Sequence, residues 1–120
     1  MRKAKLYEIA AVRTDSGNCP FKTWYSTIKD TRARAVIASR LARVAAGNLG
    51  DWKNVGGGVN ELRVDYGPGY RVYFAFHDDV MVVLIVGGDK HSQPRDIKAA
   101  QKLWEDHKHD ASTFSPDYLE

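Results

Sequence analysis

The stretch ELRVDYGPGYRVYFAF, residues 61–76, decides the fold. In it, two runs of alternating apolar and polar residues flank the segment Asp65–Gly69, and such alternation is typical of strands with one buried face. Gly67, Pro68 and Gly69 supply the backbone angles that a tight turn requires. The stretch therefore predicts a β-hairpin.

The register of this hairpin decides what lies on its polar face. We expect Val64 to pair with Tyr70. Arg63 then lies directly opposite Arg71, where two like charges repel each other. Either Glu61, which is diagonal to Arg71 in this register, neutralises the pair, or an anion is bound between the two guanidinium groups. With the further cations considered below, we interpret Glu61 as a residue that orients the arginines.

Composition and charge bound the class of protein. The chain has 120 residues, of which 43% are hydrophobic and 28% charged, as expected for one globular domain. No apolar run approaches a membrane span, the N-terminus does not resemble a secretory signal, and a single cysteine suits a reducing cytoplasm. We expect residues 1–110 to form the domain and residues 111–120 to form a mobile acidic tail.

The other periodic patterns predict the elements around the hairpin. They are a strand at Lys5–Val12, helices at Pro20–Ile28, Thr31–Ala46 and Gln93–His107, a glycine-rich connection at Asn48–Gly58 and an inner strand at Val80–Val86. The predicted fold is α+β. It consists of a small antiparallel meander sheet with an N-terminal strand, a helical hairpin on one face and a C-terminal helix. The face that carries the arginines is expected to be open.

Cations from two segments are predicted to meet at one end of this sheet. Lys90 and His91 follow the inner strand at a helix start, where free N–H groups favour anions. In a meander this segment lies at the same end as the turn Asp65–Gly69. We therefore expect Lys90 and His91 to converge with Arg71 in a shallow groove that binds an anion, and a phosphodiester is the natural ligand.

Other residues are candidates for contacts to a nucleic acid. Arg32, Arg40 and Arg43 share a stripe of the second helix, which is either a solvated face or a nucleic-acid contact, and Arg40 and Arg43 are the candidates for that contact. Tyr66 and Tyr73 could stack on a base or donate a proton. No cysteine pair or histidine spacing is typical of a metal site, and no cofactor motif is present.

These groups suit cleavage of RNA without a metal. In this reaction a base takes the proton of the ribose 2′-OH, cations stabilise the charge on phosphorus, and an acid protonates the leaving 5′-oxygen. Arg71 and Arg63 fit the electrostatic role. Histidine is a common proton donor and acceptor in catalysis, so His91 could be the acid or the base, although it could equally be an ordinary exposed histidine.

Four motifs resemble a known family. They are PFKTWYSTIKD (20–30), VIASRLARVAAGNLGD (36–51, with Val36 where the family pattern has Arg), GGGVNELRVDYGPGYRVYF (56–74) and VLIVGGDKHSQPRDIKAA (83–100). Together they resemble type II toxin–antitoxin toxins of the RelE/ParE superfamily, in particular the HigB-like "addiction module killer protein" group.

The resemblance implies a RelE-like fold and a ribosome-dependent mRNA endoribonuclease that needs no metal. It implies that Arg71 contacts the scissile phosphate, supported by Arg63 and Lys90. His91 carries over poorly, because the group commonly has Ser at this position. It also implies a cytoplasmic location, the ribosome and mRNA as partners, and a cognate antitoxin that is often a helix-turn-helix DNA-binding protein. The alternatives are a ParE-like inhibitor of DNA gyrase without nuclease activity and a non-toxic module that only binds the antitoxin.

Overall fold

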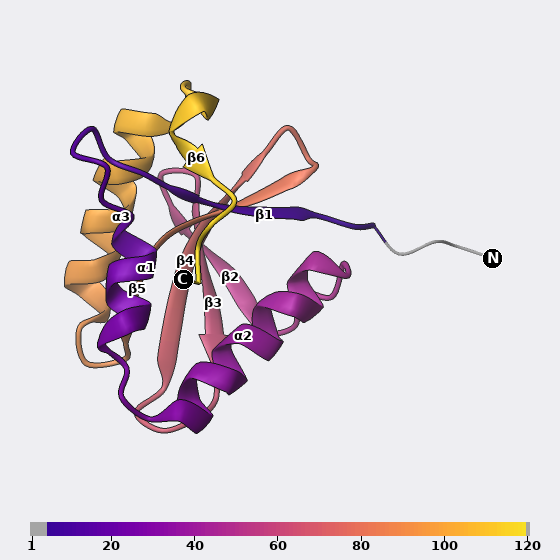
Figure 1. Cartoon of the computed structure of the whole chain (residues 1–120), viewed down its shortest axis with the longest axis vertical. Coiled ribbons are helices and arrows are strands. Elements are labelled where there is room, and N and C mark those ends of the chain that lie inside the picture. The colour runs from indigo at the N-terminus through magenta and orange to yellow at the C-terminus, as the bar shows by residue number, and fades with distance from the viewer. Residues whose placement is uncertain (1–4, 120) are drawn as a thin grey trace.

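A computed structural model describes residues 5–119 of the chain (Figure 1). Within these residues the fold is α+β, with one sheet and three α-helices. In chain order the elements are β1 (Glu8–Val12), α1 (Pro20–Thr27), α2 (Thr31–Ala45), β2 (Trp52–Gly56), β3 (Val59–Val64), β4 (Tyr70–His77), β5 (Met81–Asp89), α3 (Gln93–His107), the 3-10 turn η1 (Ala111–Thr113) and β6 (Phe114–Ser115). Across residues 5–119, none of the helices has the length and apolar character needed to cross a membrane.

The sheet has six strands in the order β2-β3-β4-β5-β1-β6. Strands β2 to β5 pair with their sequence neighbours in antiparallel fashion, but β1 lies parallel to β5, with Ile9 opposite Val82. The sheet is therefore mixed, and the prediction of an antiparallel sheet is wrong for the N-terminal strand. The reason is that the N-terminal strand lies between β5 and β6, rather than at the edge of a meander.

The predicted register of the central hairpin is confirmed. Val64 pairs with Tyr70, and Arg63 lies opposite Arg71. The turn between β3 and β4 contains Gly67 and Gly69, both with positive φ, a conformation that other residues adopt only with strain. The pattern of the sequence and the chemistry of the turn thus fix the relative placement of the two arginines.

The helices α1 and α2 cover one face of the sheet, in front of the strands in Figure 1. Their buried side chains include Phe21, Tyr25, Ile37 and Leu41, which pack against apolar residues of β3, β4 and β5. A sharp break separates the helices. The side chain of Asp30 begins α2 by accepting hydrogen bonds from the first backbone N–H groups of the helix, as the sequence predicts.

This cap gives the first testable prediction. We expect Asp30→Ala to lower the free energy of unfolding by about 1 kcal/mol, because two backbone N–H groups lose their acceptor. Asp15→Ala, in the exposed loop after β1, is the matched control, with an expected change of less than about 0.5 kcal/mol. Urea denaturation of both variants measures the difference, and equal effects would show that the cap does not stabilise the helix.

The helix α3 covers the opposite face, and the expectation of an open face there is wrong. Ala100 and Trp104 of α3 pack against Tyr73, Ala75 and other buried residues of the sheet in a second core. The apolar stripe of α3 needs a partner, and this face of β3, β4 and β5 supplies it. Arg63 and Arg71 consequently lie at the end of a covered face.

Two strands were not expected. Residues 52–56 were predicted as part of a loop but form β2, which pairs with β3. Residues 114–115 form β6, which pairs with β1, and Tyr118 and Leu119 pack against the first core. The segment predicted as a mobile tail thus contains η1 and β6, and Phe114, Tyr118 and Leu119 are partly buried. Residue 120 of the predicted tail lies outside the described residues.

Candidate functional site

A groove lies at the end of the sheet where the turn between β3 and β4 meets the end of β5. It has a volume of about 320 Å³ and is called the hairpin groove here. Its lining residues are Asp51, Arg63, Asp65, Gly67, Gly69, Arg71 and Lys90. The pairing of Tyr70 with Asp89 brings Lys90 beside the hairpin. The predicted convergence of Arg71 with Lys90 is thus confirmed.

A buried carboxylate lies beneath the two arginines. Glu61 has an exposed fraction of 0%, and its Oε1 accepts a hydrogen bond from Arg63 Nε at 3.1 Å. The same oxygen lies 3.8 Å from Arg71 Nε. Glu61 therefore offsets part of the repulsion between the arginines and also orients them. One buried carboxylate thus faces two guanidinium groups, and the carboxylates of Asp51 and Asp65 line the same groove with Lys90.

Two further donors hold Glu61 in place. Tyr73 donates its phenolic hydrogen to Oε2 at 3.1 Å, and Gln93 Nε2 donates to the same oxygen at 2.6 Å. Tyr73 comes from β4 and Gln93 from the first turn of α3, so the network joins strand and helix. Burial and the adjacent Glu61 raise the pKa of Tyr73, which keeps this phenol protonated as a donor.

Tyr73 does not reach the ligand side of the groove. Its exposed fraction is 0%, and a ring without exposed surface cannot stack on a base, so the predicted stacking role is wrong. The cause is α3, which covers the face that the sequence pattern assigned to solvent. Tyr66 is half-buried and packs against the first core. It is not among the residues that line the hairpin groove.

The guanidinium of Arg71 is held on one side and faces the groove on the other. Its side chain is 15% exposed, and Nη1 donates to the carbonyl of Tyr70 at 3.1 Å. Nε is buried and, within residues 5–119, makes no hydrogen bond. Gly69 has φ +83°, so a side chain at this position would strain the turn, although its Cβ would make only ordinary contacts with Arg71 Nη1 (3.4 Å) and Lys90 Cδ (3.5 Å).

The structure does not bring His91 into the hairpin groove. His91 is exposed and lines a separate, shallow depression with Asp89, Ser92, Pro94 and Arg95. Its backbone N–H donates to Asp89 Oδ1 at 2.8 Å, which turns the chain away from the groove toward α3. The predicted convergence of His91 with Arg71 is therefore wrong.

A second groove adjoins the first, between α2 and the end of β3. It has a volume of about 310 Å³, is called the helix groove here, and is lined by Val36, Arg40, Arg43, Asn48, Gly50, Asp51, Arg63, Val64 and Asp65. Two arginines of the predicted stripe line this groove, and they differ in their exposure to solvent. Arg43 is exposed, whereas Arg40 is only 7% exposed and donates from Nη2 to the carbonyls of Leu49 (2.6 Å) and Asp51 (3.4 Å).

Sequence reasoning missed three residues of the site. Asp65 could have been found, because strand alternation places it on the same face as Arg63. Gln93 was identified only as the start of a helix, and nothing in its local sequence indicates the contact with Glu61. Asp51 had no local signal, because it precedes a strand that was not predicted. Across residues 5–119, no group of three or more His, Cys, Asp or Glu side chains is arranged to hold a metal ion.

Comparison with known proteins gives one relative of the chain. Over 83 residues the chain is 48% identical to an uncharacterized protein of Haemophilus influenzae (strain ATCC 51907 / DSM 11121 / KW20 / Rd), and the match spans 69% of this chain and 84% of that protein. No family model matches the chain. No solved structure matches it either.

Proposed function

The chain belongs to the same family as this Haemophilus influenzae protein, and from its site we propose that it is a metal-independent endoribonuclease that cleaves mRNA. In this proposal it is the toxin of a type II toxin–antitoxin system with a RelE-like fold. It acts on mRNA held by the ribosome and thereby inhibits translation. The proposal draws its substrate from the chemistry of the hairpin groove and its biological setting from the resemblance of the four sequence motifs.

The observation that carries the proposal is the set of cations around the hairpin groove. Arg63, Arg71 and Lys90 line a pocket whose size suits a phosphodiester and its neighbouring sugar. The buried Glu61 orients the two arginines without cancelling both of their charges. Guanidinium groups held in this way match the oxygens of a phosphate, and they act most strongly where little water is present.

The chemistry requires few parts. The 2′-oxygen of a ribose forms a bond to phosphorus, the bond from phosphorus to the 5′-oxygen breaks, and the products carry a 2′,3′-cyclic phosphate and a free 5′-hydroxyl. Arg71, with Arg63, stabilises the negative charge that grows on the phosphoryl oxygens. Among the residues that line the groove, the carboxylates of Asp51 and Asp65 can accept the proton of the 2′-OH, and Lys90 can donate one to the leaving 5′-oxygen.

The proposal implies specific partners and a location. The substrate is mRNA on the ribosome, so the protein acts in the cytoplasm. The partner that neutralises it is a cognate antitoxin, expected to be a helix-turn-helix DNA-binding protein. A short reading frame beside this one that encodes such a protein would agree with the proposal.

Cell-free translation tests the function directly. The full chain is added to a reconstituted translation reaction with a defined mRNA, and the message ends are mapped by primer extension. We expect new 5′ ends within the coding region, and we expect them only when ribosomes are present. They should also form in reagents that are free of divalent-ion-dependent nucleases, so that the cleavage is due to the added protein. Intact mRNA with normal translation would overturn the proposal. Inhibition of DNA gyrase in a supercoiling assay, together with intact mRNA, would assign the protein to the ParE-like class instead.

A further inference from the structure

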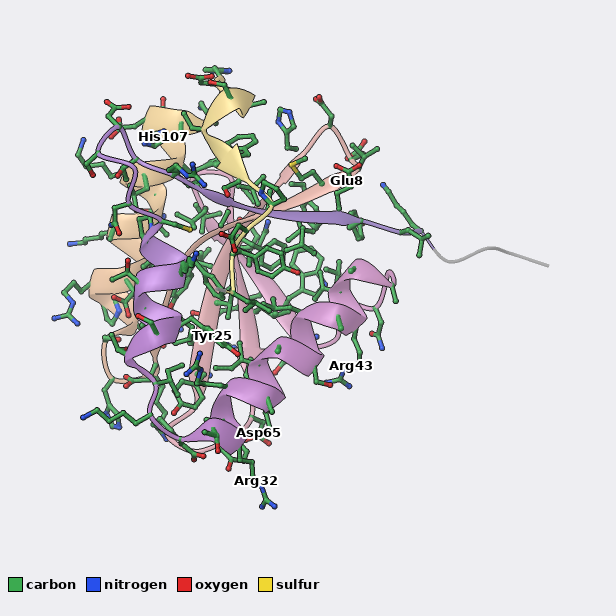
Figure 2. The ribbon with its side chains drawn as sticks, viewed as in Figure 1. Glu8, Tyr25, Arg32, Arg43, Asp65 and His107 are labelled. Atoms are coloured by element: carbon green, nitrogen blue, oxygen red, sulfur yellow. The ribbon has the colours of Figure 1, made fainter. Side chains whose placement is uncertain are left out.

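The hairpin groove and the helix groove form one continuous surface. Asp51, Arg63 and Asp65 line both of them, so they share a wall. The surface runs from Arg71, at the end of the sheet, to Arg43, on α2. Figure 2 shows Arg43 on the last turns of α2 and Asp65 beside the first half of the same helix. A ligand longer than one phosphate could therefore contact both grooves.

The surface carries cations toward both of its ends. Arg71 and Lys90 line the hairpin groove, and Arg43 lines the helix groove. The wall that the two grooves share carries Arg63 together with the exposed carboxylates of Asp51 and Asp65. Phosphates are attracted to the cations of each groove, and the two carboxylates disfavour a phosphate beside them on the wall. A single strand of RNA can place a phosphate in each groove, because a neutral nucleoside separates successive phosphates.

The helix groove is built to keep its cations in place. Arg40 is almost fully buried, and its hydrogen bonds to the carbonyls of Leu49 and Asp51 fix the loop that forms one side of the groove. Gly50 has φ +63°, and a Cβ there would lie 2.5 Å from Arg40 Nη2. Glycine thus lets the loop close over this guanidinium. Arg43 lies one turn further along α2 and is exposed, so it is the cation that can contact a ligand directly.

We propose that the helix groove is a second phosphate subsite for single-stranded RNA, one nucleotide along the chain from the phosphate bound at Arg71. Arg43 contacts this second phosphate, Arg40 supports it, and Asp51 and Asp65 face the nucleoside between the two phosphates. The inference rests on the proposed function for the choice of RNA as the ligand. It adds that the bound RNA extends over two phosphates, and that Arg43 is the residue that contacts the second one.

Titration of the full ¹⁵N-labelled chain with short RNAs tests the subsite. The probes are a 2′-O-methyl dinucleotide, with one phosphodiester, and a 2′-O-methyl trinucleotide, with two; methylation blocks the attacking oxygen, so neither is cleaved. We expect the trinucleotide to bind about tenfold more tightly, the effect of one charge-assisted hydrogen bond. We also expect the backbone amides of residues 48–51 to shift with the trinucleotide only.

Two variants make the test specific. Arg43→Ala should remove the tenfold gain, because the second phosphate loses its contact. Arg32→Ala removes the same charge from an exposed position at the first turn of α2, outside both grooves, and should keep the gain (Figure 2). A gain that survives Arg43→Ala, or that Arg32→Ala removes equally, would overturn the subsite.

The outcomes for the subsite and for the nuclease are distinguishable. Cleavage of mRNA in cell-free translation, without a gain from the second phosphodiester, would leave the proposed function standing and reject the subsite. A gain that depends on Arg43, with mRNA left intact by the same preparation, would support an extended RNA-binding groove and reject the nuclease. If neither oligonucleotide shifts any amide of either groove, the inference is wrong.

Discussion

Replacement of Arg71 by alanine is expected to reduce the rate of mRNA cleavage by a factor of about a hundred to a thousand, as found when one preorganised donor to a transition-state charge is removed. Arg71 lines the hairpin groove, and its guanidinium lies beside the carboxylate of Glu61 and donates to the carbonyl of Tyr70. Little rearrangement is therefore needed when charge develops on the phosphate. The cleavage rate in cell-free translation measures the effect.

Two further variants separate charge from geometry. Arg71→Lys keeps the positive charge but loses the planar fork of donors, so we expect it to recover less than a tenth of the wild-type rate. Arg32→Ala, at an exposed position that lines neither groove, should cleave at the wild-type rate. Thermal denaturation of each variant shows whether the fold is intact. Cleavage by a folded Arg71→Ala variant within threefold of wild type would contradict the role assigned to Arg71.

The largest expected effect on stability comes from Glu61. Glu61→Ala should lower the free energy of unfolding by about 3–5 kcal/mol, because removal of one partner leaves buried charge and polar groups uncompensated. Arg71 would lose its counter-charge, and Tyr73 and Gln93 would lose the acceptor of their hydrogen bonds. Urea denaturation measures the change.

Two other variants provide a comparison for the effect of Glu61→Ala on stability. Glu8→Ala removes an exposed carboxylate from β1 (Figure 2), and a change of less than about 0.5 kcal/mol is expected. Tyr73→Phe removes one of the hydrogen bonds to Glu61 and should cost about 1 kcal/mol. A Glu61→Ala variant as stable as Glu8→Ala would mean that the network does not contribute to folding, and that Glu61 serves only to place the arginines.

The hairpin and its register could be predicted because both depend on residues close together in the sequence. Alternation identifies the buried face, and the glycines of the turn set which residues lie opposite each other. The helices could be predicted for the same reason, since their apolar spacing, the cap at Asp30 and the position of Pro94 in the first turn of α3 are local signals. The meeting of Arg71 and Lys90 follows directly from this local information.

The parts that could not be predicted depend on contacts between distant segments. Phe74 and Tyr73 lie on opposite faces of β4. Phe74 is buried in the first core, under α1 and α2, and Tyr73 is buried in the second core because α3 packs on its face. The strand β2 is short, mostly exposed and next to glycines, so its sequence lacks the apolar signal of a strand. The parallel pairing of β1 with β5 likewise has no local signature. His91 was misplaced because strand register says nothing about the direction of the loop that follows β5.

The position of β1 also affects the order in which the sheet can form. A long stretch of chain separates β1 from both of its partners, Met81–Leu84 and Phe114–Ser115. The strands β3 and β4, which carry the arginines, can meet much earlier, because their contacts span few residues. Until β1 pairs with β5, one edge of β5 is unpaired and can associate with other chains. Closure of this edge needs a contact between distant segments, so we expect it to form later than the hairpin and to protect the folding chain from aggregation.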